Sequence, residues 1–178
     1  MNKQEFERVK NVVRNIPDFP VPGIQFKDLT TAFKDTEALQ IMTRAMADLY
    51  HDKGVTRVVG IEARGFIGGA ILATQLNAGF VPLRKPGKLP AEVIQKSYTK
   101  EYGTDTIEIH KDAITPDDVV LIHDDLLATG GTVGAAARMM EKYFQPKQLM
   151  INFIIELEEL NGRAALPAGI DVQSIIKV

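Results

Sequence analysis

Residues 119–132 read Val119-Val120-Leu121-Ile122-His123-Asp124-Asp125-Leu126-Leu127-Ala128-Thr129-Gly130-Gly131-Thr132. Four apolar residues of high β-propensity precede two acids, and a short loop with two glycines and two threonines follows. Residues 133–140 then have a composition typical of a helix. The stretch predicts a buried strand of a parallel sheet that runs into a turn and the start of a helix.

The loop after the acids is suited to a phosphate group. Free N–H groups at a helix start can bind an anion, and glycine lets the anion approach the backbone closely. Thr129 and Thr132 add hydroxyl donors, whereas Asp124 and Asp125 would repel phosphate and should face hydroxyl groups or a divalent cation. Because the stretch has neither a Walker A ending nor the G-x-G-x-x-G spacing, we expect a sugar phosphate rather than a nucleotide bound in those ways.

The composition indicates one globular domain over residues 1–178. The chain is 45% apolar and 25% charged, and its net charge of −2 gives no electrostatic reason to bind nucleic acid or an anionic membrane. It has no cysteine, which excludes disulfides and thiol chemistry. The charged start does not resemble a signal peptide, and no apolar run approaches the roughly 20 residues of a membrane span. We therefore expect a cytoplasmic protein.

The order of the predicted elements favours the α/β class. Helices are expected at 5–15, from Asp35 or Thr36 onward, at 66–76 and at 133–140. Strands are expected at 57–61, 80–84, 106–110, 119–122, 149–155 and 172–178. Such alternation predicts an open, mainly parallel twisted sheet flanked by helices, with ligands outside the carboxyl ends of its strands.

Three further segments are candidates for the same site. Glu62-Ala63-Arg64-Gly65 follows a buried strand and opens a helix, so it offers a second anion site. Residues 85–105 form a long polar segment with basic residues, here called the lid segment, which could cover a polyanion and exclude water. The rigid, proline-rich segment 19–28 carries Phe26, whose ring could stack on a purine. Taken singly, each would more often be an ordinary turn, a solvated loop or a core phenylalanine.

The stretch at 125–132 resembles the motif that binds phosphoribosyl diphosphate in the type I phosphoribosyltransferases, and specifically in the members that use adenine. The resemblance extends from about Phe19 to the end of the chain, through the lid segment and Ile155-Glu156-Leu157-Glu158-Glu159. It implies transfer of the 5-phosphoribosyl group from phosphoribosyl diphosphate (PRPP) to adenine, which gives AMP and diphosphate. It also implies a homodimer and Mg²⁺ held mainly by the diphosphate of PRPP, with no direct protein ligand.

The resemblance assigns roles to residues at matching positions. Asp124 and Asp125 would hold the ribose hydroxyls, and the residues that would enclose the 5′-phosphate are Ala128, Thr129, Gly130, Gly131 and Thr132. The residues that would bind the diphosphate are Glu62, Ala63, Arg64, Lys85, Lys88 and Tyr102, with a cis peptide between Glu62 and Ala63. The adenine would contact Ile24 and Phe26, which lie in a small N-terminal hood (residues 1–34), and Leu157 on the opposite side. Glu101 would assist proton movement at the purine.

Two other interpretations stay open at this stage. The first is a phosphoribosyltransferase for another base, since one sequence does not settle the choice of base. The second is a PRPP-sensing regulator without enzymatic activity, which would need a nucleic-acid surface that this chain's charge balance does not suggest. His123 departs from the family pattern, which has an aliphatic residue there, and we expect a core or strand-edge histidine without a role.

Overall fold

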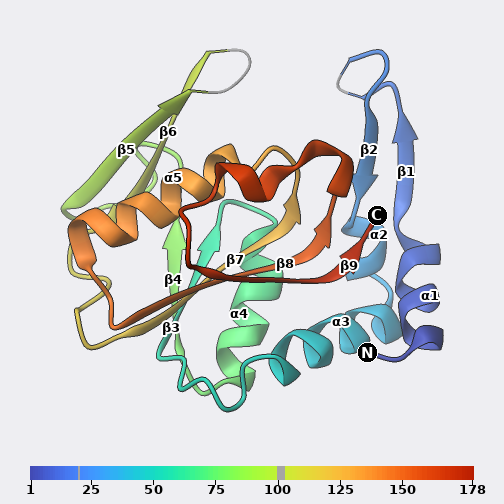
Figure 1. The fold of residues 1–178 in the computed structure, drawn as a ribbon, viewed down its shortest axis with the longest axis horizontal. Coiled ribbons are helices and arrows are strands. Elements are labelled where there is room, and N and C mark those ends of the chain that lie inside the picture. The colour runs from blue at the N-terminus through green and yellow to red at the C-terminus, as the bar shows by residue number, and fades with distance from the viewer. Residues whose placement is uncertain (20, 100–102) are drawn as a thin grey trace.

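The computed structural model describes residues 1–19, 21–99 and 103–178. Five parallel strands form the central sheet, in the spatial order β4-β3-β7-β8-β9 (Figure 1). Their bounds are Gly79–Leu83 for β4, Arg57–Ile61 for β3, Val119–Leu127 for β7, Gln148–Glu156 for β8 and Asp171–Lys177 for β9. The expected open, parallel α/β sheet is confirmed.

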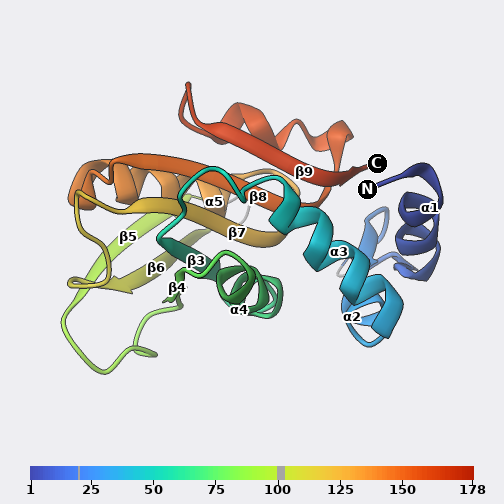
Figure 2. The same cartoon turned by 90° about the horizontal axis from the view of Figure 1, so that it is seen from below.

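Helices cover both faces of this sheet (Figure 2). One face packs against α3 (Thr36–Asp48) and α4 (Gly65–Gln75), and the other against α5 (Gly131–Met139) with its π-helical extension η1 (Met140–Phe144). Side chains alternate along β7, so Leu121 lies in the first core while Val120 and Ile122 lie in the second. A strand that is buried on both faces needs an unbroken apolar run, which explains the opening of the 119–132 stretch.

The hood contains a hairpin that the sequence did not reveal. Helix α1 (Lys3–Val12) ends before the expected residue 15, because β1 (Arg14–Pro17) pairs antiparallel with β2 (Gln25–Asp28). A short helix, α2 (Thr30–Phe33), follows. The hairpin strands have few apolar residues, so the alternation typical of a hairpin was not visible, although Pro22-Gly23 between the strands is a turn signal.

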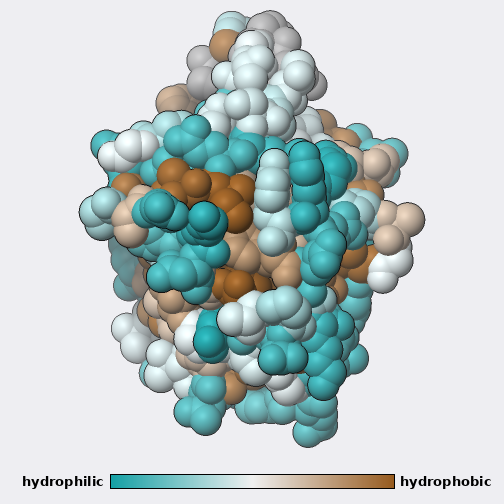
Figure 3. All heavy atoms as spheres, turned by 90° about the vertical axis from the view of Figure 1, so that its left-hand side faces the viewer, coloured by the Kyte–Doolittle hydropathy of each residue, from teal (hydrophilic) through white to brown (hydrophobic). Residues whose placement is uncertain are grey.

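A second hairpin corrects the interpretation of the lid segment as an irregular loop. Strand β5 (Val93–Thr99) pairs antiparallel with β6 (Thr104–His110) in a sheet of their own, so the expected strand at 106–110 exists outside the main sheet. Only one side of β5 is covered, by packing of Ile94 and Tyr98 against the core. The exposed side carries the polar residues that made the segment look like a loop. Figure 3 shows hydrophilic residues around this face of the molecule and apolar residues gathered in its middle.

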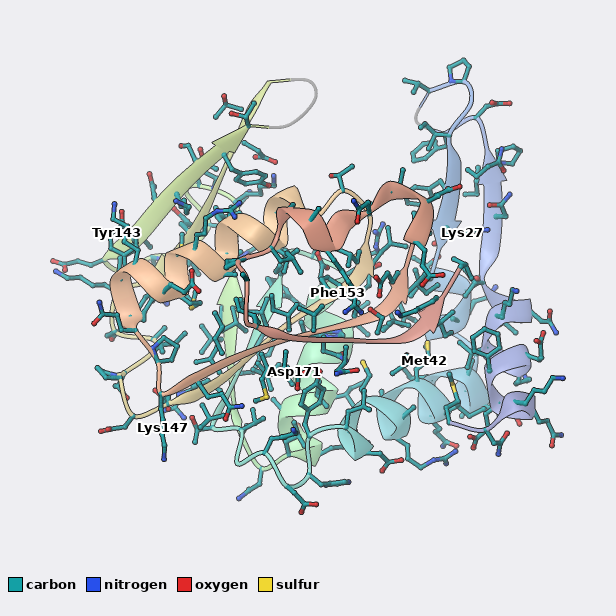
Figure 4. The ribbon with its side chains drawn as sticks, in the orientation of Figure 1. Lys27, Met42, Tyr143, Lys147, Phe153 and Asp171 are labelled. Atoms are coloured by element: carbon teal, nitrogen blue, oxygen red, sulfur yellow. The ribbon has the colours of Figure 1, made fainter. Side chains whose placement is uncertain are left out.

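Both hairpins project beyond the carboxyl ends of the parallel strands (top of Figure 1). The connection between β8 and β9 also crosses there. That connection contains two short 3₁₀ helices, η2 (Glu158–Leu160) and η3 (Gly162–Ala165). Phe153 of β8 lies fully buried in the middle of the molecule, whereas Tyr143 and Lys147 lie at its periphery (Figure 4). Among the described residues, no helix combines the length and apolar character needed to cross a membrane.

Candidate active site

The order of the strands places a switch point between β3 and β7. From β3 the chain crosses to β4 on one side, and it later returns to β7 on the other side of β3. Ligands of open α/β sheets bind outside the carboxyl ends of the strands at such a point. The Glu62–Gly65 turn follows β3 there, and the Asp124–Asp125 pair lies near the end of β7.

The two acids of the pair have different environments. Asp125 is buried and forms an ion pair with Arg64, whose Nε donates to Oδ2 of the carboxylate. Asp124 accepts a hydrogen bond of 2.9 Å from the N–H of Asp125 and has no ion-pair partner within the described ranges. Burial raises the pKa of Asp124 well above its ordinary value, and the nearby charge of Asp125 adds to this rise. Hydroxyl donors or a cation would therefore stabilise this pair.

Arg64 connects the sheet to the hood. It is positioned at the start of α4 by the turn after β3, where the peptide bond between Glu62 and Ala63 is cis, as expected. Its guanidinium carbon lies 5.5 Å from the ring centroid of Phe26 in the hood hairpin. One cation thus contacts both a residue expected to hold ribose and a residue expected to stack on the base.

The loop of residues 128–132 lines an open cavity of about 620 Å³. All five residues face it, together with Asp124, and helix α5 begins at Gly131. Gly130 has a φ of +77°, and a Cβ there would lie 2.2 Å from the carbonyl oxygen of Gly162. Position 130 therefore requires glycine, because a side chain would collide with η3. The start of α5, which follows directly, lines the cavity and offers backbone N–H groups to an anion.

The β5–β6 hairpin reaches the same cavity through Tyr98, which was not among the predicted site residues. Its hydroxyl lies 2.8 Å from the hydroxyl of Thr132 and donates to Asp105 over 3.3 Å. The signal that could have found Tyr98 is the alternation of residues 93–99, which places it on the same side of β5 as Ile94.

The basic residues after β4 are held by two carboxylates. Glu62 accepts hydrogen bonds from Arg84 Nε at 3.1 Å and from the N–H of Lys85 at 3.0 Å, while the ammonium of Lys85 pairs with Asp105. The N–H of Glu62 donates to the carbonyl of Leu83. Glu62 therefore holds the turn, and the cationic groups around it are those that would attract an anion.

On the hood side, the ring of Phe26 packs edge-on against Phe19, with 5.1 Å between the centroids. Phe26 is partly exposed and Ile24 is exposed. Leu157 follows β8, and its N–H donates to the carbonyl of Leu127 over 2.9 Å, which places it next to the strand that carries the acids. The predicted residues Glu101 and Tyr102 lie outside the described residues.

His123 is a core residue, as expected, but within the described residues its Nε2 is buried without a hydrogen-bond partner. Its side chain is fully buried and its Nδ1 lies 3.0 Å from Oδ1 of Asn152. Burial lowers the pKa of His123 to about 4, so the ring is neutral near pH 7. In the ranges that the structure describes, no cluster of three or more His, Cys, Asp or Glu side chains is arranged to hold a metal ion.

Comparisons with known proteins identify consistent relatives. The family model of the phosphoribosyl transferase domain matches residues 30–154. The chain is 60% identical over 164 residues to the adenine phosphoribosyltransferase of Bacteroides thetaiotaomicron. The aligned residues make up 92% of this chain and 93% of that protein. Its fold is similar to the adenine phosphoribosyltransferase of Rhodothermus marinus, with a TM-score of 0.92, 48% identity and coverage of 99% and 100% of the two chains. It is also similar to the APRTase of Giardia lamblia complexed with 9-deazaadenine, with a TM-score of 0.91, 41% identity and coverage of 97% of each chain.

Proposed function

This chain belongs to the phosphoribosyl transferase family, and from that membership we propose that it transfers the 5-phosphoribosyl group of PRPP to adenine, giving AMP and diphosphate. The fold is that of a type I phosphoribosyltransferase. The observation that carries the proposal is that Asp124 and the loop of residues 128–132 line one cavity at the switch point. Beside them, Arg64 forms an ion pair with Asp125 and contacts the ring of Phe26 in the hood. The named relatives support adenine as the base.

The ribose phosphate would occupy the cavity along β7. Asp124 and Asp125 would accept hydrogen bonds from the ribose 2′- and 3′-hydroxyls, and the loop 128–132 would bind the 5′-phosphate. The support is that all five loop residues and Asp124 line one cavity. Thr129 and Thr132 supply hydroxyl donors, and the start of α5 supplies backbone donors.

The diphosphate would bind at the Glu62–Gly65 turn. Arg64, Lys85 and Lys88 would stabilise its charge as it leaves, and Tyr102 is carried over from the resemblance. Lys85 is already beside this turn, through the hydrogen bond from its N–H to Glu62. We also propose that Mg²⁺ enters with PRPP and neutralises its diphosphate without a direct protein ligand, and the family resemblance supports this role.

Adenine would lie between the hood and the segment after β8. Phe26 and Ile24 would contact one face, and Leu157 the other. As diphosphate leaves with the electrons of its bond to the ribose C1′, the lone pair of adenine N9 forms the new bond to that carbon. Adenine then has one surplus proton, which we assign to Glu101. The protein would contribute mainly by positioning the two substrates and by stabilising the leaving charge.

An assay with labelled adenine, PRPP and Mg²⁺ tests this function directly. We expect AMP and diphosphate in equal amounts, and much lower kcat/KM with hypoxanthine or guanine. A similar kcat/KM for hypoxanthine would overturn the choice of base and leave phosphoribosyl transfer intact. Absence of turnover with any purine base would contradict the function as a whole.

We further propose a cytoplasmic homodimer. The family resemblance supports the dimer. Light scattering coupled to size-exclusion chromatography should give about twice the 19.6 kDa of one chain. A mass of one chain at micromolar concentration would contradict the dimer.

A further inference from the structure

Glu108 is a buried acid on β6 beside the basic turn that follows β4, and no role has yet been given to it. Its side chain is 1% exposed. One carboxylate oxygen accepts from the N–H groups of Lys88 and Leu89, at 3.1 and 3.2 Å, and the other accepts from Gln95 Nε2 at 3.1 Å. The carboxylate thus contacts two segments that are distant from it in sequence.

The backbone of Glu108 makes a third connection. Arg84 and Glu108 exchange both of their N–H···O bonds, at 2.9 and 2.8 Å, which attaches the residue after β4 to β6. The turn of residues 84–89 is therefore held at both ends. Glu62 binds it at Arg84 and Lys85, and Glu108 binds it at Lys88 and Leu89.

The charge on Glu108 fits this arrangement. Burial by itself would raise the pKa of Glu108, but hydrogen bonds from Gln95 and from the N–H groups of the turn outweigh burial and lower that pKa below its ordinary value. The carboxylate is therefore ionised at neutral pH. Because N–H groups of the turn point at Glu108, the turn offers a ligand mainly its lysine side chains, and Lys88 is exposed.

We propose that Glu108 is a positioning residue of the diphosphate site, which fixes the 84–89 turn so that Lys85 and Lys88 stay beside the Glu62–Gly65 turn. This inference rests on the proposed function, which places the diphosphate there. Glu108 lies behind the turn and does not touch the substrate. Its removal should weaken binding of the diphosphate group and leave binding of the ribose 5′-phosphate and the base unchanged.

Glu108→Leu removes the acceptors while keeping a buried side chain. We expect the KM for PRPP and the inhibition constant of Mg²⁺-diphosphate to rise about tenfold or more, because the two charge-assisted hydrogen bonds to the turn are lost together with the one from Gln95. The dissociation constant of AMP, which has no diphosphate, should stay within about twofold. Glu108→Gln keeps an acceptor for the turn and should stay within about threefold of the wild type for PRPP. Glu92→Leu, at an exposed acid just before β5, is the matched control and should behave as the wild type.

The affinities of Glu108→Leu for AMP and for Mg²⁺-diphosphate, each compared with the wild type, test the proposal. An equal loss of affinity for both ligands would show that Glu108 only maintains the fold, and unchanged affinity for both would show that it positions nothing. If Glu108→Leu does not fold, Glu108→Asp retracts the charge from the turn and should weaken diphosphate binding at least threefold with AMP unaffected. A wild-type protein that binds neither PRPP nor AMP would instead overturn the proposed function.

Discussion

The hydroxyl of Tyr98 lies 2.8 Å from the hydroxyl of Thr132, and this contact joins the β5–β6 hairpin to the loop proposed to bind the 5′-phosphate. Because Tyr98 donates its one hydroxyl hydrogen to Asp105, the Thr132 hydroxyl donates to the Tyr98 oxygen, and the two hydrogen bonds of this chain strengthen each other. The hairpin and the loop would then act as one unit when PRPP binds.

Tyr98→Phe removes this hydroxyl and keeps the ring. A neutral hydrogen bond contributes about 0.5–1.5 kcal/mol, so the KM for PRPP should rise roughly 3- to 10-fold while the KM for adenine stays nearly constant. Steady-state kinetics with each substrate varied in turn measures both constants. Tyr143→Phe, at an exposed tyrosine in η1, is the control. Equal KM values for PRPP in Tyr98→Phe and the wild type would exclude the role of the contact.

Asp125→Asn should weaken binding of PRPP. The carboxylate holds the Arg64 guanidinium and, in our proposal, ribose hydroxyls, so the amide loses charge-assisted hydrogen bonds of about 1.5–3 kcal/mol each. Titration calorimetry with PRPP and Mg²⁺ gives the affinity, and Asp117→Asn, at an exposed acid before β7, is the control. If Asp125→Asn binds PRPP with the affinity of the wild type, Asp125 does not hold the ribose hydroxyls.

Phe26→Ala should raise the KM for adenine more than the KM for PRPP, because only the base would stack on this ring. Loss of one stacking face costs on the order of 1–3 kcal/mol. The ring also contacts Phe19 and Arg64, so thermal unfolding of the variant must be measured beside its kinetics. Parallel increases in both KM values would mean that Phe26 supports the hood rather than the base.

Glu101→Gln tests the proton step at adenine. It keeps the size of the side chain and its hydrogen-bonding capacity but removes the base, so turnover should fall roughly 10²- to 10⁴-fold. Affinity for PRPP should barely change, because its proposed contacts lie on other residues. Glu92→Gln, at an exposed acid of the same segment, is the control. A single-turnover rate equal to that of the wild type would show that Glu101 takes no part in proton transfer.

The parts of the structure that the sequence predicted are those with strong local signals. The apolar run before Asp124 predicted β7, and the glycines and threonines after it predicted the loop that lines the cavity. The Glu62–Gly65 turn was expected beside them, because ligands of open α/β sheets bind outside the carboxyl ends of the strands. The hood hairpin and β5 were missed because their strands carry polar residues and β5 is covered on one side only, whereas β6 overlaps the strand expected at 106–110. The ion pair between Arg64 and Asp125 depends on strand order, which no local pattern contains.

The hood should also lose stability in acid because of Asp28. Hydrogen bonds from Thr30 and from Arg14 lower the pKa of Asp28 to about 2 in the folded protein, against roughly 3.9 when unfolded. A carboxyl with a depressed folded pKa contributes stability above its unfolded pKa, and this contribution disappears as pH falls from about 5 to 2. Its size at neutral pH is on the order of 2 kcal/mol. Urea unfolding of the wild type and Asp28→Asn should therefore show a large difference in unfolding free energy at pH 7 and roughly half of it at pH 3. A difference that does not change with pH would mean that the Asp28 charge does not hold β1 to β2.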